Sequence, residues 1–308
     1  MSHNRIELSI IIVNYYSEEL VNQCVQSIIE FSALDEIQII IVDNGSNSSI
    51  LSNFKDKAIK IVKNRKNEGF GAACNLGVEA SKSEYLLFLN PDTKVFKNSL
   101  SKAISVIKEK PEITVLGCKQ IDENKITHRS CARYLTVNRY INKLLKLNIL
   151  FPNVFKGVHM SDWDHESSKY VDHVIGAFYL IRRKDFLESN GFSKDYFVYY
   201  EDLDLSKRIV DNGGKIYYDS TIEIFHQGGG ASESVKAERL FYSLDSILIF
   251  SKKHLSCFKY VIMFIIIIFI EPLLRLFSEM IKLDLKGFFE VFKSYKLLYI
   301  KRFGFANR

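Results

Sequence analysis

Asp92 is the carboxylate that this chain places most clearly for chemistry. It follows Asn90 and Pro91, directly after the uninterrupted apolar run Tyr85–Leu89. Such a run is typical of a strand buried on both faces of a parallel sheet, and Pro91 ends it because proline cannot donate to the ladder. Asp92 is therefore expected at the carboxyl end of a central strand, where it can hold a hard divalent cation bridging a diphosphate. The alternative is a plain turn, which these residue types also favour.

A second acidic cluster, Glu201, Asp202 and Asp204, follows the aromatic stretch at residues 197–200 and begins an amphipathic helix. Acids in a first turn are favoured by the helix dipole, which is a purely structural explanation. The dipole does not explain the apolar residues directly before them. A carboxylate beside an apolar wall can act as a general base, so this cluster is a candidate for removing a proton.

The histidine with the most suggestive position is His226, which ends a predicted strand at residues 216–225. Three glycines, Gly228, Gly229 and Gly230, come soon after it and permit a close-fitting loop. A lone histidine is more often structural than a ligand, so the position alone does not decide its role.

The elements that must carry these residues alternate between strand and helix. Strands are predicted at residues 8–13, 37–42, 59–63 and 85–89, with helices between most of them. This alternation requires a parallel sheet with right-handed crossovers, a Rossmann-like first half. The strand ends then bring four polar side chains to one edge of the sheet: Asn14, Asp43, Asn67 and Asp92.

The loop after the first strand excludes a dinucleotide cofactor. NAD or FAD binding needs Gly-x-Gly-x-x-Gly there, whereas this chain has Asn14-Tyr15-Tyr16. After the second strand comes Asp43-Asn44-Gly45-Ser46. That sequence can form an Asx-turn with Gly45 at positive φ, and such a turn can still point Asp43 at a ligand.

Four short motifs, in this order and at this spacing, resemble the family-2 glycosyltransferases with the GT-A fold, and most of all their rhamnosyltransferase branch. They are Ser9-Ile10-Ile11-Ile12-Val13-Asn14-Tyr15, Val42-Asp43-Asn44-Gly45-Ser46, Asn67-Glu68-Gly69-Phe70-Gly71-Ala72-Ala73-Cys74-Asn75-Leu76-Gly77 and Leu89-Asn90-Pro91-Asp92. The last motif has Asn-Pro-Asp where Asp-x-Asp is commoner. The resemblance covers about residues 7–255. It implies an α/β GT-A fold with a Rossmann-like nucleotide-binding half, a mixed central sheet and an acceptor half.

The resemblance also implies roles for individual residues. Asn14 or Tyr15 would contact the nucleoside of a nucleotide-sugar, and Asp43 would accept a hydrogen bond from the pyrimidine imide. Asp202 would deprotonate the acceptor hydroxyl. Further donor-binding positions are Asn67, Gly71, Asn75, Asn90 and Asp92. The implied acceptor-binding positions are Gly176, Ala177 and Glu201, and the implied ligands of Mg²⁺ or Mn²⁺ are Asp92 and His226. An extra residue before Ser232 departs from the family pattern.

The second half of the chain is less regular. Residues 121–170 mix aromatic and basic side chains without a clean period, so they either shape an acceptor site or form a surface excursion. A strand is predicted at residues 171–183. The pair Gly176-Ala177 inside it implies that another group packs closely over this point.

The net charge of +6 is concentrated in the tail. From Ser251 onward there are 11 Lys/Arg and 4 Asp/Glu, whereas the preceding residues hold 31 and 32. A neutral body argues against nucleic-acid binding. Lysines alternating with large apolar residues are typical of a helical tail lying on an anionic membrane, and the uncharged run at residues 260–270 is too short for a span. Alternatively the tail packs on the body or on another subunit, which would make an oligomer.

Cysteine usage and the N-terminus indicate the compartment. Five cysteines show no paired spacing, and no charged-then-apolar leader precedes the first strand. We therefore expect a reducing environment, with the protein cytoplasmic and peripheral on the inner face of the cell membrane.

The sequence thus predicts an inverting glycosyltransferase. By resemblance it moves L-rhamnose from dTDP-L-rhamnose to a hydroxyl of a lipid-linked or polysaccharide acceptor in cell-surface glycan synthesis. We expect a nucleotide-sugar-binding half at residues 1–115, an acceptor-binding and catalytic half at 116–250, and a basic tail at 251–308. The competing hypothesis is a catalytically silent module that binds sugar-nucleotide or glycan within a polysaccharide assembly complex, because the metal motif has one carboxylate instead of two.

Overall fold

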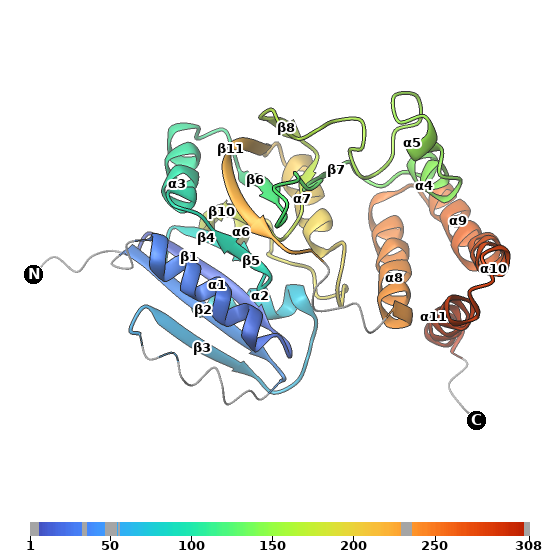
Figure 1. Ribbon diagram of the computed structural model, residues 1–308, viewed down its shortest axis with the longest axis horizontal. Helices are drawn as coiled ribbons and strands as arrows, with labels where there is room; N and C mark the ends of the chain where they lie inside the picture. Colours follow the sequence, from blue (N-terminus) through green and yellow to red (C-terminus); the bar gives the residue numbers. More distant parts are fainter. Residues whose placement is uncertain (1–5, 33–35, 47–53, 55, 229–235, 305–308) are drawn as a thin grey trace, which may run out of the picture. The chain divides into compact units, whose positions relative to one another are not determined.

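The computed structural model describes the chain except for residues 1–5, 33–35, 47–53, 55, 229–235 and 305–308 (Figure 1). The chain forms two compact units. A sheet unit comprises Met1–Tyr134, Val158–Lys194 and Glu201–Ala231, and a helical unit comprises Leu135–Gly157, Asp195–Tyr200 and Ser232–Arg308. These units divide the chain differently from the three consecutive segments expected from the sequence.

The sheet unit is built on a mixed sheet whose strands follow the order β3-β2-β1-β4-β10-β6-β11-β5, with β8 beside β11. The first four of these strands are parallel, β10 runs antiparallel to both β4 and β6, and β6 and β11 are parallel. Their bounds are β1 Leu8–Asn14, β2 Ile37–Asn44, β3 Ile59–Asn64, β4 Tyr85–Leu89, β5 Thr93–Val95, β6 Val115–Ile121, β8 Lys169–Val171, β10 Phe178–Arg182 and β11 Ile216–His226. A small second sheet pairs β7 Cys131–Ala132 with β9 His173–Val174.

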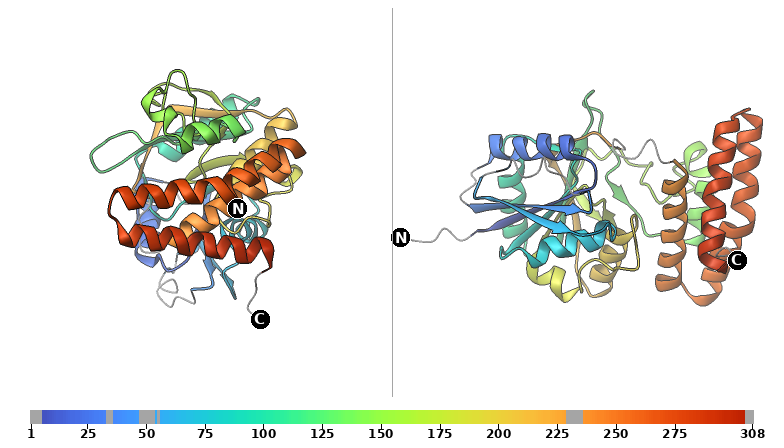
Figure 2. Two further views of the ribbon diagram at one scale, coloured as in Figure 1. Left: turned by 90° about the vertical axis from the view of Figure 1, so that its right-hand side faces the viewer. Right: turned by 90° about the horizontal axis from the view of Figure 1, so that it is seen from below.

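Helices cover both faces of the large sheet because side chains along each strand alternate between faces. Ile10 and Ile12 of β1 pack with α1 and α3, whereas Ile11 of β1 packs with α2, α6 and α7. The right-hand view of Figure 2 shows α1 and α2 on opposite sides of the first strands. The helix bounds are α1 Glu18–Phe31, α2 Phe70–Glu79, α3 Ser99–Glu109, α6 Arg183–Glu188 and α7 Glu201–Asp211. The four predicted strands and the mixed sheet are therefore confirmed.

One predicted strand is wrong in its extent. Residues 171–183 do not form a single strand, because β9 ends at Val174 and β10 begins at Phe178. Gly176 and Ala177 lie in the connection between these two strands. The close packing that their small size implied is present there, as the site geometry below shows.

The helical unit contains α4 Val137–Leu144, α5 Leu147–Leu150, α8 Lys236–His254, α9 Cys257–Ile265, η3 Ile266–Ile270, α10 Glu271–Ile281 and α11 Leu285–Phe303. Helix α11 packs along both α8 and α10. Asp245 of α8 is 2% exposed and accepts ion pairs from Lys301 and Arg302 of α11 at 2.8 and 2.5 Å. Residues 135–157, from the irregular segment, belong to this unit, so the tail is only part of a larger helical body.

A single continuous helix joins α9, η3 and α10. It runs for 25 residues from Cys257 to Ile281 and is long and apolar enough to cross a membrane, a test that buried core helices also pass. The expectation that the apolar run is too short was therefore wrong about the helix, which continues past Glu271. The middle segment η3 is a π-helical turn, and the hydroxyl of Tyr299 on α11 donates to the carbonyl of Ile268 there at 2.6 Å.

Candidate active site

The ends of β1 and β2 meet through Asn14 and Asp43, which are direct neighbours in the parallel register. Asn14 is 0% exposed, and its amide donates to Asp43, Glu18 and Ser46 at 3.3, 3.3 and 2.8 Å. Its oxygen accepts from Ser17. With its bonding capacity used inside the protein, Asn14 holds the Asp43 carboxylate in place, and Tyr15, 48% exposed, is the better-placed of the two predicted nucleoside contacts.

The Asp43 loop is a tight turn that contacts the loop after β3. The hydroxyl of Ser46 donates to Asp43, and Gly45 has φ +91°. A Cβ on Gly45 would lie 2.7 Å from the backbone nitrogen of Asn67, so glycine is required by conformation and by contact. Asn67 accepts from Asn44 at 2.8 Å and from the Gly69 N–H at 2.9 Å. Gly45 thus has the positive φ expected of it, and the turn brings Asp43 and Asn67 to the same edge of the sheet.

Two residues of helix α2 serve the fold rather than an open donor site. A Cβ on Gly71 would lie 3.0 Å from Cβ of Phe192 and 3.3 Å from Glu201, so this glycine permits close packing against protein side chains. The amide of Asn75 donates to the Phe192 carbonyl at 2.8 Å and accepts from its N–H at 3.0 Å. Each position therefore has a packing role, and the donor contact predicted for it stays a prediction.

Asp92 and His226 lie together, as the sequence predicted. Nε2 of His226 is 3.4 Å from Oδ1 of Asp92. Strand β5 begins directly after Asp92 and pairs with β11, which places Thr93 opposite His226. Nδ1 of His226 is 2.7 Å from Oε1 of Gln120 on β6. Because an amide oxygen only accepts a hydrogen bond, Nδ1 of His226 donates in this contact, and Nε2 is the ring nitrogen that faces Asp92.

This pair fits a divalent cation. A carboxylate and a neutral imidazole are common ligands of Mn²⁺, and Mg²⁺ is commonly held by one or two carboxylates together with substrate phosphates. Gln120 fixes the histidine tautomer that coordination requires. Among the described residues no group of three or more His, Cys, Asp or Glu side chains could hold a metal ion. A metal at Asp92 and His226 would therefore depend on oxygen atoms of its substrate.

The Asn90-Pro91-Asp92 turn is connected to the acidic cluster through the antiparallel pair β4 and β10. The N–H of Asn90 donates to the carbonyl of Ala177 at 3.1 Å. The N–H of the preceding residue, Gly176, donates to Oδ2 of Asp202 at 2.8 Å. A Cβ on Gly176 would lie 3.2 Å from the same oxygen, so Asp202 is the group that packs over the Gly176-Ala177 pair.

Asp202 is held as a carboxylate. Its Oδ2 lies 3.6 Å from Nε2 of His173, whose Nδ1 is 2.8 Å from the hydroxyl of Ser206. Burial opposes ionisation, but His173 and the hydrogen bonds from Gly176 and Leu203 outweigh burial and lower the pKa of Asp202. Its side chain is 19% exposed, so the ionised group remains within reach of a substrate.

The neighbouring acid behaves in the opposite way. Glu201 is 5% exposed, and its Oε2 is buried with no hydrogen-bond partner within the described residues. Burial, followed by repulsion from Asp202, raises the pKa of Glu201 to about 8. Two adjacent acids with pKa values pushed apart have separate roles. Glu201 packs against Gly71, and its contact with an acceptor stays a prediction.

The third acid and the aromatic wall have structural partners. Asp204 is 0% exposed and accepts from Nε of Arg208 at 2.8 Å. The aromatic residues before the acids belong to the helical unit, where Phe197 stacks on Tyr242 with 4.6 Å between ring centroids and Tyr200 contacts Phe250. Within the sheet unit, the contacts of Asp202 are His173 and backbone N–H groups.

Sequence reasoning missed two residues that complete this site, His173 and Gln120. Both are buried, and each is brought to its partner from a different strand. One sequence signal could have found His173: it comes three residues before Gly176, whose small size already indicated a close contact. Gln120 gave none. Ser232, where the chain departs from the family pattern, lies outside the described residues, as do Gly229 and Gly230.

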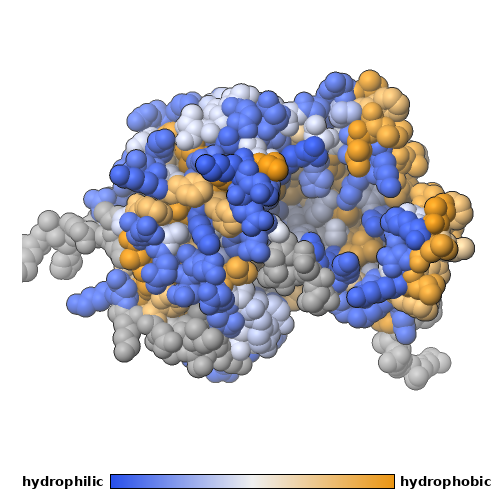
Figure 3. Space-filling model, viewed as in Figure 1, coloured by the Kyte–Doolittle hydropathy of each residue, from blue (hydrophilic) through white to orange (hydrophobic). Residues whose placement is uncertain are grey.

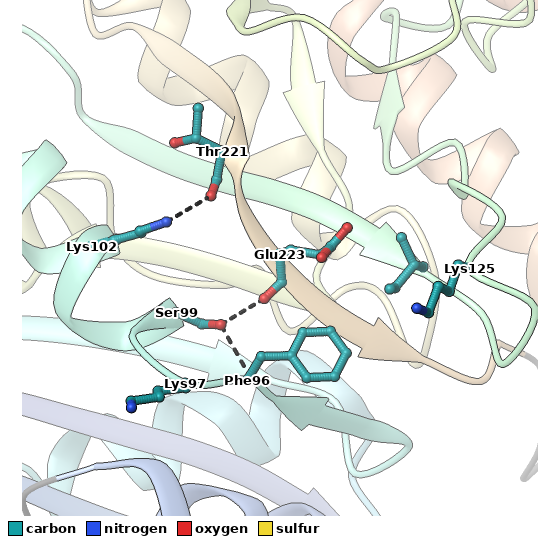
Figure 4. Close-up of a pocket in the computed structure, with 8 residues that line it drawn as sticks. Phe96, Lys97, Ser99, Lys102, Lys125, Thr221 and Glu223 are labelled. Atoms are coloured by element: carbon teal, nitrogen blue, oxygen red, sulfur yellow. Dashed lines mark hydrogen bonds between the residues drawn. The ribbon is translucent and has the colours of Figure 1, made fainter.

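A separate pocket of about 400 Å³ lies where α3 meets β11 in the same unit (Figure 4). Phe96, Lys97, Lys102, Lys125 and Glu223 line it, and Ser99 donates to the carbonyl of Glu223 at 2.6 Å. None of the predicted site residues lines this pocket. The size of a cavity therefore does not locate the chemistry in this molecule.

Comparison with solved structures identifies the class of fold. The mannosyltransferase PcManGT from Pyrobaculum calidifontis, solved with GDP-Man and Mn²⁺, aligns with 97% of this chain and 81% of its own at a TM-score of 0.57 and 13% identity. GalNAc-T7, solved with UDP, GalNAc and Mn²⁺, aligns with 73% of this chain and 44% of its own at a TM-score of 0.53 and 17% identity. The fold is that of the GT-A glycosyltransferases.

Comparison of sequences then gives the family. The model of Glycosyl transferase family 2 matches residues 9–161, about half of the chain. Rhamnosyltransferase WbbL of Escherichia coli K12 is 28% identical over 188 residues, which are 58% of this chain and 68% of the relative. Glycosyltransferase GlyG of Streptococcus pneumoniae is 21% identical over 81% of this chain and 80% of its own. The chain belongs to glycosyltransferase family 2, which confirms the expectation of an enzyme.

Proposed function

We propose that this enzyme transfers L-rhamnose from dTDP-L-rhamnose, with inversion, to a hydroxyl of a lipid-linked or polysaccharide acceptor. The observation that carries the proposal is the ionised Asp202 carboxylate, bound to Gly176 and connected through Ala177 to the turn that bears Asp92. This arrangement supplies a proton acceptor at the start of α7 and a cation site at the turn before β5. The similarity to a rhamnosyltransferase supports the choice of sugar.

In the proposed mechanism Asp202 accepts the proton of the acceptor hydroxyl while the hydroxyl oxygen attacks the anomeric carbon. The bond from that carbon to the diphosphate oxygen breaks, and the nucleoside diphosphate leaves. His173 and the Gly176 N–H keep Asp202 ionised and oriented before the substrate binds. Asp92 and His226 would hold Mg²⁺ or Mn²⁺, whose chemical contribution is to stabilise the negative charge of the leaving diphosphate.

The same proposal assigns the donor contacts. Asp43 accepts the imide N–H of the pyrimidine, Tyr15 lies against the nucleoside, and Asn67 and Asn90 complete the edge of the sheet around the donor. Of the expected donor residues, Asn14, Gly71 and Asn75 act indirectly through the positions of Asp43, Phe192 and Glu201. Gly176 and Ala177 form the floor of the acceptor site beneath Asp202.

We further propose that the helical unit holds the enzyme peripherally on the inner face of the cell membrane, where a lipid-linked acceptor would be met. Support comes from the basic excess after Ser251 and from the apolar helix Cys257–Ile281. Peripheral binding should be released by high salt or alkaline carbonate. If only detergent extracts the full-length protein, the helix Cys257–Ile281 spans the bilayer and the peripheral assignment fails.

The test of the reaction is the variant Asp202→Asn, assayed with radiolabelled dTDP-L-rhamnose and an extract of bacterial membrane lipids. Transfer should fall by about 10²–10⁴-fold, the usual contribution of a general base, while dTDP binding measured by calorimetry stays near wild type. Asp211→Asn is the matched control, because Asp211 lies on the same helix, is exposed and pairs with Lys207 at the surface. Undiminished transfer by Asp202→Asn would refute the assignment.

A further inference from the structure

Large apolar side chains lie on the surface of the two units very unequally. Most of those exposed in the described residues belong to the helical unit, although it is the smaller part of the chain. Figure 3 shows apolar surface over α5 and over the C-terminal helices. On α10 and the turn before it, Phe269, Leu273, Phe277 and Met280 recur at intervals of three or four residues and so share one exposed face. The tail after Ser251 does not account for all of the exposed apolar surface of the helical unit.

A second exposed apolar group comes from the middle of the sequence. It consists of Leu145, Ile149, Leu150, Phe151, Val154 and Phe155, which we call the α5 loop residues. Ile149, Leu150 and Val154 are 68%, 66% and 73% exposed. Isolated exposed apolar residues are ordinary, but six within eleven positions form a contiguous patch, which marks an interaction site.

The α5 loop is a built structure that displays these side chains. The N–H groups of Val154 and Phe155 both donate to the Phe151 carbonyl, so these backbone groups are hydrogen-bonded within the loop. At the base of the loop the Asn142 amide donates to the Lys156 carbonyl at 3.1 Å. A Cβ on Gly157 would lie 2.8 Å from the side-chain nitrogen of Asn148, so the closure is tight. The exposed apolar tip is therefore held in place, as in compact surface loops with a binding function.

A cationic pocket of about 240 Å³ opens beside this loop, between α4 and α10. Its two carboxylates are already paired, Glu271 with Arg275 at 2.7 Å and Glu279 with Lys282 at 2.7 Å. Two further lining residues, Lys143 on α4 and Lys146 directly before α5, form no ion pair within the described residues, although Glu271 interacts electrostatically with Lys143. The pocket thus keeps an excess of two positive charges, which suits a phosphate group.

We propose that the α5 loop and this pocket form a docking site for an anionic phospholipid bilayer. The α5 loop residues enter the boundary between headgroups and acyl chains, and Lys143 and Lys146 bind a headgroup phosphate. Basic pockets between helices bind such headgroups, and apolar tips flanked by lysines suit the membrane interface. A second protein copy is the less fitting occupant, because lysine is depleted from the centres of protein interfaces.

This inference extends the proposed membrane location but does not depend on the tail or on sugar transfer. Full-length protein is sedimented with sucrose-loaded vesicles of phosphatidylcholine, with and without phosphatidylglycerol, in the absence of donor. Phe151→Glu should lower binding to both kinds of vesicle by on the order of tenfold, because an apolar contact with lipid is lost. Lys143→Glu with Lys146→Glu should lower binding by at least about tenfold on phosphatidylglycerol vesicles alone.

Matched controls come from the sheet unit. Ile126→Glu changes a side chain that is 60% exposed there, and Lys184→Glu reverses a charge on α6. Both should bind vesicles like wild type. Thermal unfolding of every variant shows whether it is folded. A polarity-sensitive fluorophore on Leu150→Cys, in a Cys257→Ser background, should shift to the blue on vesicles, whereas one on Ile126→Cys should not.

Three results would overturn the inference. The first is wild-type vesicle binding by a folded Phe151→Glu protein. The second is an unshifted fluorophore at position 150. The third is that Phe151→Glu changes the molecular mass measured by light scattering while its vesicle binding stays intact. The patch would then be an interface between copies of the chain. If Phe277→Glu abolishes vesicle binding while Phe151→Glu does not, the tail proposal stands and the α5 loop proposal falls. Transfer activity enters none of these results, so a failure of the proposed function would remain separate.

Discussion

The sheet unit and the helical unit differ in where their large apolar side chains lie. In the sheet unit the strands β1, β2 and β4 are almost wholly buried apolar residues, and most charged groups lie outside them. In the helical unit large apolar side chains cover the outside, while Glu271, bound by Arg275 and Tyr140, and Asp245, bound by Lys301 and Arg302, are buried. Most of the exposed large apolar side chains of the described residues therefore belong to the helical unit, where directional ion pairs fix how the helices meet.

The largest effect should follow from removing one of those buried charges. Asp245→Ala leaves Lys301 and Arg302 without their shared partner, and breaking a buried pair costs about 3–5 kcal/mol. Limited proteolysis should cut the variant within α8–α11, while dTDP binding by the sheet unit persists. The control is Asp284→Ala in the same unit, which removes only the cap of α11 and should cost about 1 kcal/mol. Equal protease resistance of the two variants would contradict this account of the helical unit.

The next effect concerns the cation site of the sheet unit. Asp92→Ala should weaken Mn²⁺-dependent dTDP binding by at least about 100-fold, since the loss of an outer partner of a ligand already costs 10–100-fold. Gln120→Leu, which leaves both ligands in place but frees the tautomer of His226, should cost roughly tenfold. Calorimetry with Mn²⁺ and with EDTA measures both. If EDTA changes neither binding nor transfer, there is no metal site at Asp92 and His226.

Glu201 should make the stability of the sheet unit fall with rising pH. Its pKa of about 8 when folded lies above the ordinary value of 4.5, so the folded state binds the proton more tightly. The stabilisation is complete below pH 4.5 and is lost by roughly 1.4 kcal/mol per pH unit as the pH rises toward 8. Glu201→Gln should flatten the dependence of Tm between pH 5 and 8. Glu188→Gln, an exposed acid on α6, should leave the slope unchanged. If Tm still falls with rising pH in Glu201→Gln, another titrating group causes the pH dependence.

The smallest effect is a shift in a pH profile. His173 helps to lower the pKa of Asp202, so His173→Gln should raise that pKa and move the acidic limb of kcat/KM to higher pH. At low pH, kcat/KM of the variant should be about tenfold below wild type, and the difference should shrink toward neutral pH. Gln keeps a hydrogen-bond donor near Asp202 but carries no charge. A uniform loss at every pH would instead indicate that His173 acts only through packing.

The fold of the first half can be predicted from the sequence because each strand there is recognisable from its own residues. Residues 85–89 read as a buried strand from their own composition, and β4 occupies those positions. The site is predictable where the partners of a residue lie near the same sheet edge, as Asp92 and His226 do. It is not predictable where a partner comes from an element of unknown placement. Gly71 looks the same in sequence whether it faces a nucleotide or Phe192, and only the packing of α2 decides.

The boundary of the tail shows the same limit. Charge counting places it at Ser251, but Leu244, Ile247 and Leu248 before that point are buried in the same unit as α11. A chain ending near Lys253 would lose the partners of Asp245 and expose this face of α8. Composition reports where charges accumulate, whereas a compact unit is defined by contacts. Residues 135–157 join the unit from far away in the sequence, which no count along the chain detects.

The π-helical turn at Ile266–Ile270 makes the helical unit sensitive to the deletion of a single residue. A π turn holds one residue more than an α turn, and each residue of a helix turns it by about 100°. Removing Ile267 would restore an unbroken α-helix and rotate everything after it by about that angle. Glu271 would swing away from Tyr140, and the carbonyl of Ile268 would return to the helix ladder instead of accepting from Tyr299. The direction in which the exposed face of α10 points therefore depends on the presence of one isoleucine.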